Sequence, residues 1–405
     1  MATSRSPDVL YIAYWGAAEP LGQSLVLPAL EEMSERGVTF TLISYEKATD
    51  LTQSAKTEAI QSRLRRRGVR WCRLRYHKRP RVPATLFDLV QGWSSGVALG
   101  RKAGVTVIHG RTFIGGLVGR AVASTLRVPF VYHNEGFYPD EMADGGFWRA
   151  GSAQHRLAKR LEAMMYDSAD GLVVLSHRAA DAVSSRVGVR RRGTPIVVVP
   201  SCVDLARFRL TSAPRPDPEP LRLVYSGAAG GRYELDRVGR FVARIAGSRP
   251  TRLQVLSREP RPAIAAMLGA GGLDPSLWSL RYVDHSEMPG VLCGNHAGLF
   301  FLARGKSEHG CSPTKIGEYW ACGLPVVTSA HVSDIDDLVR HFRSGVIIEE
   351  HTDEAYAKAG ADLIELLRDP ELSIRCRAAA EQHYALGPAC ERQMALYHKL
   401  ITPAT

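Results

Sequence analysis

The sequence has 405 residues, of which 45% are hydrophobic and 23% are charged. These are the proportions of globular proteins, and they exclude a disordered or fibrous chain. A single hydrophobic core stops growing at roughly 250–300 residues, so two domains are expected. No apolar run reaches the ~20 residues of a membrane-spanning helix, and no leader-like apolar segment follows Met1. We therefore expect a cytoplasmic protein that is at most peripheral on the inner face of a membrane.

The net charge of +11 is unevenly distributed along the chain. Residues 1–205 carry a net charge of +10, and the segment 63–81 alone holds ten Lys or Arg residues and no acidic residue. Such a segment favours an anionic partner, for which a membrane surface or a phosphorylated lipid is the leading candidate. The alternative is a solvated arginine-rich surface. Nucleic acid is not expected, because no nucleic-acid-binding motif accompanies the charge.

No metal site is expected. The seven cysteines are scattered and form no C-x-x-C pair, which indicates reduced thiols rather than a zinc site or a disulfide framework. The D-I-D triplet at 334–336 resembles the metal-binding triplet of some transferases. It also opens a predicted helix, where acidic residues are ordinary, and we interpret it in that way.

In chain order, the first half alternates between predicted strands and helices. Strands are predicted at 8–16, 38–46, 105–111, 128–136, 170–176 and 194–201, and helices at 24–37, 114–127, 154–169 and 177–188, with 16–24 as a loop. Short loops between alternating strands and helices are typical of βαβ units and a parallel sheet.

The alternation restarts after 209–220, which holds four prolines and is the best linker candidate. Strands are predicted at 221–227, 251–257, 280–285, 297–303, 324–329 and 344–349, and helices at 233–247, 313–322 and in the tail from 352 to 401. The fold class is therefore α/β, with two doubly wound domains. Open parallel sheets bind ligands at the carboxyl ends of their strands, so a cleft between two such domains is the expected substrate site.

The stretch 309–327 contains the most informative short helix. Ser312 is a good N-cap, Pro313 suits the first helical position, and Gly323 suits the position after the last turn. The free N–H groups at a helix start form an anion site, at which Lys315 would share a bound phosphate. Glu318 lies one turn further on and could accept hydrogen bonds from a ribose. The alternative is a simple ion pair between Lys315 and Glu318 on a solvated helix.

A glycine-rich turn follows the strand at 221–227. Gly227, Gly230 and Gly231 precede Arg232, which is expected at the start of the next helix. Glycines allow the backbone to approach a phosphate closely, and an arginine can clamp it. This turn and the helix start at 313 would lie on the same edge of one sheet, which together suggests a diphosphate. Alone, the turn is also compatible with an ordinary βα loop.

Several segments resemble one enzyme family. The segment SPTKIGEYWACGLPVVTS (312–329) resembles the nucleotide-sugar signature of GT-B glycosyltransferases, in particular family 4. The segments 12–37, 170–183 and 194–208 are similar to further parts of that family, and 107–148 is similar to a bacterial polysaccharide-type subset. The resemblance is weakest at 63–100 and in the tail.

The resemblance implies a GT-B fold with two Rossmann-like domains facing a central cleft. Residues 1–207 would bind the acceptor, with the last helix (388–402) crossing back to them, and residues 208–387 would bind the donor. The implied activity is a retaining, metal-independent hexosyltransferase-type reaction without a cofactor. It would move a sugar from a UDP- or GDP-type donor to a hydroxyl of a saccharide, a lipid-linked acceptor or a small molecule.

The resemblance also implies the roles of individual residues. Gly227, Arg232, Lys315 and the backbone of Pro313 and Thr314 would hold the diphosphate, Glu318 the ribose and the neighbourhood of Val283 the base, with Gly22 near the reacting centre. His133 would lie beside the donor sugar. From their positions in the chain rather than from the resemblance, His109, Arg111 and Glu135 are candidate acceptor-binding residues, the alternatives being polar strand-end residues for the first two and a solvated acidic loop for Glu135. His133, Arg232 and Lys315 form the predicted catalytic set, because two cations stabilise a departing diphosphate and a neutral histidine suits a positively charged sugar.

Two departures from the family pattern leave alternatives open. The first glutamate of the E-x7-E signature is replaced by Gly310, with Glu308 and His309 as possible substitutes. His133 and Glu135 stand where the polysaccharide-type subset often has an aspartate and an arginine. Gly310 supports one alternative, a catalytically silent sugar-nucleotide binding protein. The other alternative is an epimerase-like enzyme that acts on a nucleotide sugar on the same fold.

Overall fold

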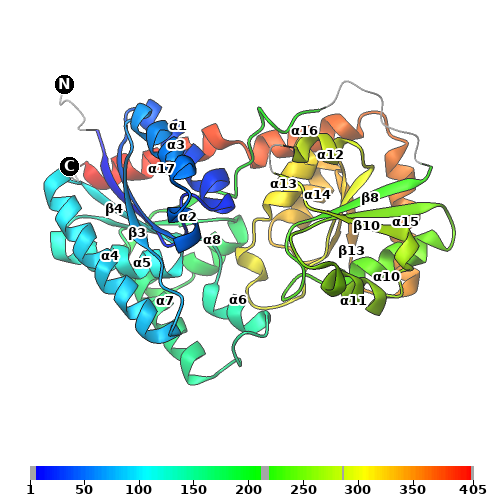
Figure 1. Ribbon diagram of the computed structural model, residues 1–405, viewed down its shortest axis with the longest axis horizontal. Helices are drawn as coiled ribbons and strands as arrows, with labels where there is room; N and C mark the ends of the chain where they lie inside the picture. The colour runs from blue at the N-terminus through cyan, green and yellow to red at the C-terminus, as the bar shows by residue number, and fades with distance from the viewer. Residues whose placement is uncertain (1–5, 211–218, 285–286, 403–405) are drawn as a thin grey trace. The chain divides into compact units, whose positions relative to one another are not determined.

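The computed structural model describes residues 6–210, 219–284 and 287–402 (Figure 1). Its contacts divide the chain into two units. The first comprises Met1–Pro139, Gly151–Pro200 and Leu386–Thr405, and the second comprises Asp140–Ala150 and Ser201–Ala385. The observed division thus falls after Pro200, where the sequence suggested 207, and it assigns 140–150 to the second unit. Of the predicted linker 209–220, residues 211–218 lie outside the described residues.

The first unit contains a seven-stranded sheet in the order β3-β2-β1-β4-β5-β6-β7, with every adjacent pair parallel. Its strands are β1 (Asp8–Ala13), β2 (Thr39–Glu46), β3 (Arg70–Arg75), β4 (Val107–Arg111), β5 (Phe130–Asn134), β6 (Gly171–Val174) and β7 (Ile196–Val198). β1, β4, β5 and β6 are almost entirely buried, which explains their continuous apolar sequences.

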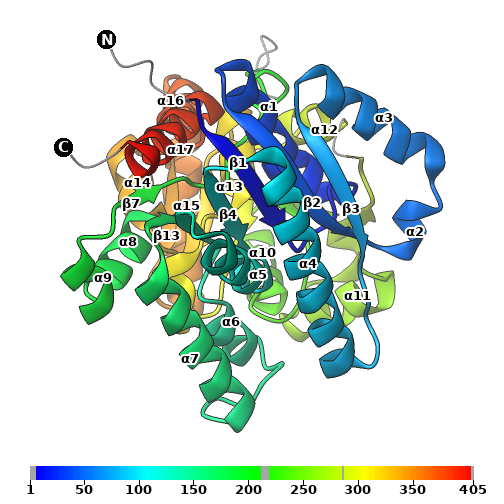
Figure 2. The same ribbon diagram turned by 90° about the vertical axis from the view of Figure 1, so that its left-hand side faces the viewer.

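Helices cover both faces of the first sheet (Figure 2). They are η1 (Gly22–Val26), α1 (Leu27–Glu35), α2 (Ala48–Leu51), α3 (Ser54–Arg66), α4 (Arg81–Ala103), α5 (Thr112–Leu126), α7 (Ala153–Ser168), α8 (His177–Ser184), α9 (Val187–Arg192) and α17 (Leu386–Ile401). A further short helix, α6 (Tyr138–Asp144), begins in the first unit and ends in the second. Because α17 packs against α1, the last helix belongs to the first unit.

The predicted loop at 16–24 is wrong in its second half. The helical conformation begins at Pro20 and passes through the π-helical turn η1 before α1. Pro28 has no N–H, and its ring would clash with the carbonyl group four residues earlier in a regular α-helix. A wider π turn relieves this clash, so the proline that seemed to belong to a regular helix explains the irregular start.

The second unit contains a six-stranded parallel sheet in the order β10-β9-β8-β11-β12-β13. Its strands are β8 (Leu221–Ser226), β9 (Thr251–Leu256), β10 (Trp278–Arg281), β11 (Ala297–Phe300), β12 (Val326–Ser329) and β13 (Gly345–Ile348). Its helices are α10 (Leu235–Ala246), α11 (Arg261–Ala270), η2 (Pro275–Leu277), α12 (Met288–Cys293), η3 (Glu308–Gly310), α13 (Thr314–Ala321), α14 (Ile335–Phe342), α15 (Asp353–Leu367) and α16 (Leu372–His383).

Both sheets have the strand order of the Rossmann fold, in which the direction of winding reverses next to the first strand of the unit. In the first unit this switch point lies between β1 and β4, and in the second between β8 and β11. The predicted fold class, two doubly wound parallel α/β domains, is therefore confirmed. Among the described residues, no helix combines the length and the apolar character needed to cross a bilayer.

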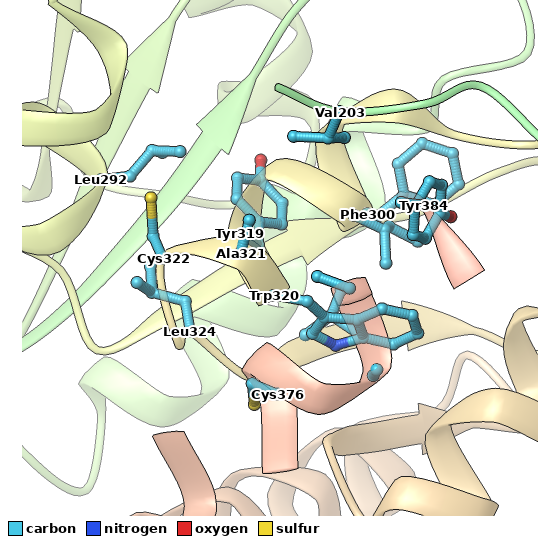
Figure 3. Packing of buried hydrophobic residues seen from close by; sticks show 14 of the residues in the cluster. Val203, Leu292, Phe300, Tyr319, Trp320, Ala321, Cys322, Leu324, Cys376 and Tyr384 are labelled. Atoms are coloured by element: carbon cyan, nitrogen blue, oxygen red, sulfur yellow. The ribbon is translucent and has the colours of Figure 1, made fainter. Parts of the chain in front are cut away.

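The short helix α13 is anchored by its own buried side chains (Figure 3). Trp320 is fully buried, donates a hydrogen bond from Nε1 to the carbonyl oxygen of Ser344 at 3.2 Å, and packs edge-on against Tyr384. At its end, Gly323 has φ +76°, and the N–H of Leu324 donates to the carbonyl oxygen of Tyr319 at 2.9 Å. This is a Schellman ending, in which a left-handed residue satisfies the last carbonyl groups. The predicted glycine stop is confirmed.

The predicted start of α13 is wrong by one residue. Pro313, with φ −71° and ψ 108°, occupies the N-cap position, and no side chain caps the helix. Ser312 instead accepts a hydrogen bond at its Oγ from the backbone N–H of Ser201 at 3.1 Å. Its hydroxyl group is therefore engaged in a tertiary contact within the second unit rather than in capping.

Candidate active site

Lys315 lies in the first turn of α13, beside the switch point of the second sheet. Its ammonium nitrogen is buried and has no hydrogen-bond partner among the described residues. It lies over the aromatic rings of Tyr233, Tyr225 and Phe300, at 4.2, 5.0 and 5.3 Å from their centroids. Ring faces attract a cation but accept no ordinary hydrogen bond, so the three N–H donors remain available.

The burial of Lys315 alters its titration. Desolvation lowers the pKa of its ammonium group from 10.5 to about 8, against smaller opposing effects of Cys311 and Glu318. A buried lysine with such a lowered pKa is a candidate for a functional role. An incoming anion would restore the charged form, since opposite charges raise the pKa of an amine.

The glycine-rich turn lies against Lys315. Gly227 has φ +111°, and a Cβ at this position would lie 2.8 Å from the Lys315 nitrogen. Gly230 and Gly231 also adopt positive φ angles of 84° and 63°, which side chains rarely tolerate. The turn therefore requires glycine both for its conformation and to leave space beside the ammonium group.

Arg232 follows the turn, and two of its side-chain nitrogen atoms are buried without a partner in the described structure. Its Nε and one terminal nitrogen have no partner among the described residues, while the other lies 3.4 Å from Glu141. Both Arg232 and Lys315 act electrostatically on the thiol of the partly buried Cys311, so both cations lie within electrostatic range of that thiol. The structure thus brings Gly227 against Lys315 and places Arg232 directly after the same turn.

Arg232 was expected at a helix start, and this is wrong. α10 begins at Leu235, three residues later. The backbone of the turn is instead held by the end of β11: the N–H of Ala303 donates to the carbonyl oxygen of Arg232 at 2.8 Å, and Tyr233 forms a bridge with Leu302. These bonds hold the turn at 230–233 against the segment after β11, so the arginine is positioned by sheet-edge contacts rather than by a helix.

The remaining predicted donor-binding residues lie around the start of α13. Pro313 is its N-cap and Thr314 its first residue, so their backbone groups belong to the helix start, where N–H groups lack intrahelical partners. Glu318 is one turn further on and only 9% exposed. It acts electrostatically on Lys315, and no direct Lys315–Glu318 ion pair within 4 Å is found among the described residues.

Val283 is 6% exposed and belongs to a hydrophobic cluster with Val203 and Ile316. The strand predicted at 280–285 is shorter than expected, because β10 ends at Arg281, and His285 lies outside the described residues. A hollow of ≈ 590 Å³ lies next to Val283 and is lined by Ser257, Arg258, Glu259, Leu280 and Tyr282. The open space is therefore at these neighbours rather than at Val283 itself.

Four predicted residues of the first unit gather at the ends of β4 and β5. Arg111 pairs in register with His133 across the two strands, forms an ion pair with Glu135 and donates to the hydroxyl group of Tyr11 at 3.1 Å. His109 is fully buried. Arg111 thus pairs with Oε1 of Glu135, while Oε2 of Glu135 and Nε2 of His133 are buried and have no partner among the described residues.

The two histidines are neutral in the folded protein. Burial lowers the pKa of His109 and of His133 well below 6.5, and the charge of Arg111 lowers both further. Arg111 itself is held in its charged form by Glu135 and by Tyr11, although burial opposes this.

Gly22 lies in the π turn rather than in the predicted loop. It is buried, and a Cβ there would collide with the carbonyl oxygen of Gly16. The glycine thus lets the helix start approach the loop after β1, at the switch point of the first sheet. That loop is held by the carboxylate of Glu46, which accepts from the N–H groups of Ala17 at 2.7 Å and Ala18 at 3.2 Å.

Upstream of α13, Glu308 and His309 are the possible substitutes for the glutamate that Gly310 replaces. The carboxylate of Glu308 accepts from the N–H of Gly305 at 3.2 Å, and the His309 side chain is exposed. The D-I-D triplet serves the backbone: Asp336 accepts from the N–H groups of His331 and Val332 at 2.8 and 3.1 Å. In the described part of the chain, no group of three or more His, Cys, Asp or Glu could hold a metal ion.

The aromatic rings around Lys315 and the hydrogen-bond partners of the buried histidines were not predicted from the sequence. Tyr225 and Phe300 occupy strand ends and Tyr233 follows the glycines, so their placement at one sheet edge could have been noticed. Tyr397 of α17 contacts His109 at 2.8 Å. It is 288 residues away in sequence, and no local pattern indicates that contact.

Comparisons with known proteins agree with this architecture. The model of Glycosyltransferase Family 4 matches residues 24–207, and the model of Glycosyl transferases group 1 matches residues 282–383. No curated protein matches the sequence.

Solved structures share the fold over nearly the whole chain. Sucrose-phosphate synthase from Thermosynechococcus elongatus is 15% identical with a TM-score of 0.69, covering 97% of this chain and 99% of its own. A glycosyltransferase from Rickettsia africae ESF-5 is 10% identical, with a TM-score of 0.70 and coverages of 99% and 100%. HepE from Anabaena, in complex with UDP-glucose, is 13% identical, with a TM-score of 0.63 and coverages of 96% and 98%. With two family models matched in order and two Rossmann-like units observed, the chain belongs to the GT-B glycosyltransferases of the family 4 type.

Proposed function

We propose that this glycosyltransferase is a retaining, metal-independent enzyme that transfers a sugar from a nucleoside diphosphate sugar to a hydroxyl group. The observation that carries the proposal is the buried Lys315 ammonium group, which has no hydrogen-bond partner in the described structure and lies against the glycine turn. The complex of the similar HepE structure with UDP-glucose supports a donor of the UDP type.

The proposed mechanism rests on the charge of the leaving group. As the bond between the anomeric carbon and the diphosphate breaks, negative charge accumulates on the diphosphate oxygens. Arg232, Lys315 and the N–H groups at the start of α13 are already oriented and partly desolvated, so they stabilise that charge without reorganising. Two cations supply what a metal ion supplies in other transferases, which is the basis for proposing metal independence.

The nucleoside is proposed to occupy the same edge of the second sheet. Glu318 would accept the ribose hydroxyl groups, and the base would enter the hollow lined by Leu280 and Tyr282. In that hollow the guanidinium group of Arg258 lies 4.9 Å from the ring centroid of Tyr282, which provides a flat surface of the kind on which a base can stack.

The neutral state of His133 fits the proposed sugar chemistry. Departure of a diphosphate leaves positive charge on the sugar ring, and a neutral hydrogen-bonding group beside it avoids electrostatic repulsion. The acceptor is proposed to be a hydroxyl of a saccharide, a lipid-linked saccharide or a small molecule. The pairing of Arg111 with Glu135 leaves the acceptor role of these residues and of His109 as a prediction.

A transfer assay tests the proposal. A thermal-shift screen of nucleotide sugars first identifies the donor, since a ligand that binds only the folded state raises the melting temperature. The donor is then incubated with a panel of hydroxyl acceptors, with and without EDTA, and the anomeric configuration of the product is read by NMR. Retained configuration and unchanged turnover in EDTA are expected. An inverted product, or activity abolished by EDTA and restored by a divalent metal, would contradict the corresponding part of the proposal.

The two alternatives give different results in the same experiment. An epimerase-like enzyme converts the donor without an acceptor, so incubation with donor alone separates it from a transferase. A silent binding protein, which the replacement at Gly310 favours, binds the donor and yields no product across the acceptor panel. Restoring the signature residue with Gly310→Glu in parallel shows whether the missing carboxylate limits turnover.

A further inference from the structure

The first three turns of α4 expose an apolar face. Val82, Leu86 and Val90 recur at helical spacing and are 69%, 57% and 61% exposed, with Phe87 and Trp93 beside them at 55% and 41%. Exposed large apolar residues are usually scattered singly over a protein surface. Here five of them fall within twelve consecutive residues, which marks an interaction surface.

This face is additional to the one that α4 uses for packing within its own unit. Within the same turns the packed face carries the buried residues Ala84, Asp88 and Gly92, and a Cβ at Gly92 would lie against Tyr45 of β2 and 3.1 Å from Val118 of α5. Gly92, with Gly96 and Gly100 further along, therefore lets α4 lie close against α5. Figure 2 shows α4 in the foreground at the outer side of the first unit. Trp93 donates a hydrogen bond to Thr125 of α5 at 3.0 Å, and Phe87 packs edge-on against His77. The exposed face therefore consists mainly of Val82, Leu86 and Val90.

The segment that leads into α4, together with α4 itself, is strongly basic, although Arg63 and Arg67 pair with Glu31 and Glu35 of α1. Residues 63–103 contain twelve Lys or Arg residues and a single acidic residue, Asp88. Asp88 is fully buried, and its carboxylate lies 2.6 Å from Nδ1 of His77, so it offers no charge to the surface. The same contact ties the loop before α4 to the helix, and this loop presents the exposed Lys78 and Arg79 directly before Val82.

We propose that this face of α4 docks on an anionic lipid bilayer, with its apolar side chains at the headgroup–acyl boundary and Lys78 and Arg79 on the lipid phosphates. An apolar stripe beside clustered cations is the pattern of helices that lie in a membrane interface. A second copy of this chain fits less well, because a symmetric pairing through this face would bring two basic segments together. The proposal goes beyond the proposed function, since it concerns neither donor nor acceptor chemistry.

Vesicle co-sedimentation tests the docking surface without any sugar substrate. The full chain is mixed with vesicles of phosphatidylcholine, either alone or with an equal part of phosphatidylglycerol, at low and at high salt. The bound fraction should be high only with the anionic vesicles at low salt, because surface charges are screened by salt. The double variant Leu86→Gln, Val90→Gln should weaken binding at least tenfold, and Lys78→Glu, Arg79→Glu should abolish it.

Leu157→Gln is the matched control, because Leu157 is 58% exposed on α7 of the same unit. It should bind vesicles as the unchanged protein does. Equal binding by the α4 double variant, or no binding to anionic vesicles at low salt, overturns the proposal. So does a dimer in solution that the double variant dissociates while no vesicles are bound, since that outcome assigns the face to a second copy of the chain.

A second inference concerns the proton on His133, and it is carried by a buried chain of hydrogen bonds. Gln393 donates from its amide nitrogen to the hydroxyl oxygen of Tyr397 at 2.7 Å. The Tyr397 oxygen lies 2.8 Å from Nδ1 of His109, whose Nε2 lies 3.2 Å from Nδ1 of His133. All four side chains are at most 3% exposed.

The direction of each bond follows from the first. An amide nitrogen only donates, so the Tyr397 hydroxyl accepts there. Since no other acceptor for its own proton is found in the described structure, it directs that proton to His109. His109 then accepts at Nδ1 and, being neutral, carries its proton on Nε2, from which it donates to Nδ1 of His133. His133 must therefore carry its own proton on Nε2, the buried atom that has no partner in the described structure.

We infer that Gln393 and Tyr397 are positioning residues that fix His133 as a hydrogen-bond donor at Nε2. The inference rests on the proposed function, in which His133 would donate to an oxygen of the transferred sugar. These hydrogen bonds thus link α17 to His133 on β5 of the same unit.

The tautomer can be measured without any donor. In 15N NMR spectra of the histidine-labelled protein, His133 should show a protonated Nε2 and an unprotonated Nδ1. Tyr397→Phe should give a mixture of tautomers and lower kcat about tenfold with little change in the donor KM, the pattern of an interaction made mainly in the transition state. Tyr356→Phe is the matched control, because it removes a similar bond, of 2.9 Å, to His351 in the second unit.

Two results overturn the inference: a proton on Nδ1 of His133 in the unchanged protein, or an unaltered His133 spectrum in folded Tyr397→Phe. Failure of the proposed function is a separate result, since it appears as absent transfer by the unchanged protein whatever the tautomer.

Discussion

The ammonium nitrogen of Lys315 lies 4.2 Å from the centroid of the Tyr233 ring. This contact joins the first turn of α13 to the residue that follows the glycine-rich turn, two segments that are more than eighty residues apart in sequence. A ring face stabilises the charge while leaving the N–H donors unused. The pair therefore holds a cation ready for an anion.

The first prediction concerns the pH dependence of donor binding. Burial lowers the pKa of Lys315 to about 8, so its charged form is lost in the free protein as the pH rises through 8. A bound diphosphate raises this pKa, so binding above pH 8 must take up a proton. The affinity for UDP-glucose should then fall by up to tenfold per pH unit above pH 8.

Calorimetry at pH 7, 8 and 9 measures this dependence. Lys315→Ala is the reference, because the titration of the ligand itself is common to both proteins. An affinity that changes with pH equally in the two proteins would show that Lys315 does not bind the anion as a cation.

The second prediction concerns the space beside Lys315. Gly227→Ala places a Cβ 2.8 Å from the Lys315 nitrogen in a backbone with φ +111°. It should destabilise the fold by about 1–2 kcal/mol through backbone strain and also weaken donor binding at least tenfold. Thermal unfolding and calorimetry measure the two effects separately.

Gly272→Ala is the matched control for that substitution. Gly272 also has a positive φ, of 80°, but nothing lies within 4 Å of its added Cβ. Gly272→Ala should lower the free energy of unfolding by a similar amount and leave the affinity for the donor unchanged. If both variants bind the donor normally, close approach at Gly227 is unimportant.

The third prediction concerns Arg232. Its donors without partners should act mainly on the departing diphosphate, so Arg232→Gln should lower kcat by about 10²–10³, as the loss of a charge-stabilising donor does. Arg261→Gln serves as control, since Arg261 lies over Trp278 at 4.7 Å on α11, away from this turn. A variant with raised KM but unchanged kcat would limit Arg232 to ground-state binding.

The fourth prediction concerns acid stability. The pKa values of buried His109 and His133 lie well below 6.5, so below about pH 6.5 the unfolded chain binds protons that the folded protein does not. Each histidine should then remove about 1.4 kcal/mol of unfolding free energy per pH unit as the pH falls.

Melting temperatures at pH 7.5 and 5.0 test the sign. The fall in melting temperature between these pH values should be smaller for His133→Gln than for the unchanged protein. It should be unchanged for His398→Gln, since His398 is an exposed residue of α17. An equal loss in all three proteins would refute the assignment to the buried histidine.

Much of the fold could be predicted from the sequence, because hydrophobic periodicity and composition determine each strand and helix locally. The buried strands of both sheets are continuous apolar runs, and Gly323 marks the end of α13 because only a residue that tolerates a left-handed conformation fits there. The predicted boundaries of helices were wrong where a tertiary contact or a proline determined them. Ser312 engages Ser201 instead of capping, and Pro28 converts a regular helix start into a π turn.

The candidate site was predictable in part for the same reason. The glycine turn and Lys315 each follow a strand, and strand order brings them to one edge. The aromatic rings around Lys315 and the link from Tyr397 to His109 depend on side-chain directions and on contacts across the whole chain, which residue spacing does not encode.

The proposed function requires a diphosphate site at Lys315, with Glu318 on the ribose. Calorimetry of UDP-glucose, or of the donor identified by the thermal-shift screen, with Lys315→Ala, Glu318→Ala and the exposed control Lys306→Ala measures it. We predict at least tenfold weaker binding for the first two variants and unchanged binding for the third. Unchanged affinity in both Lys315→Ala and Glu318→Ala would contradict the site assignment.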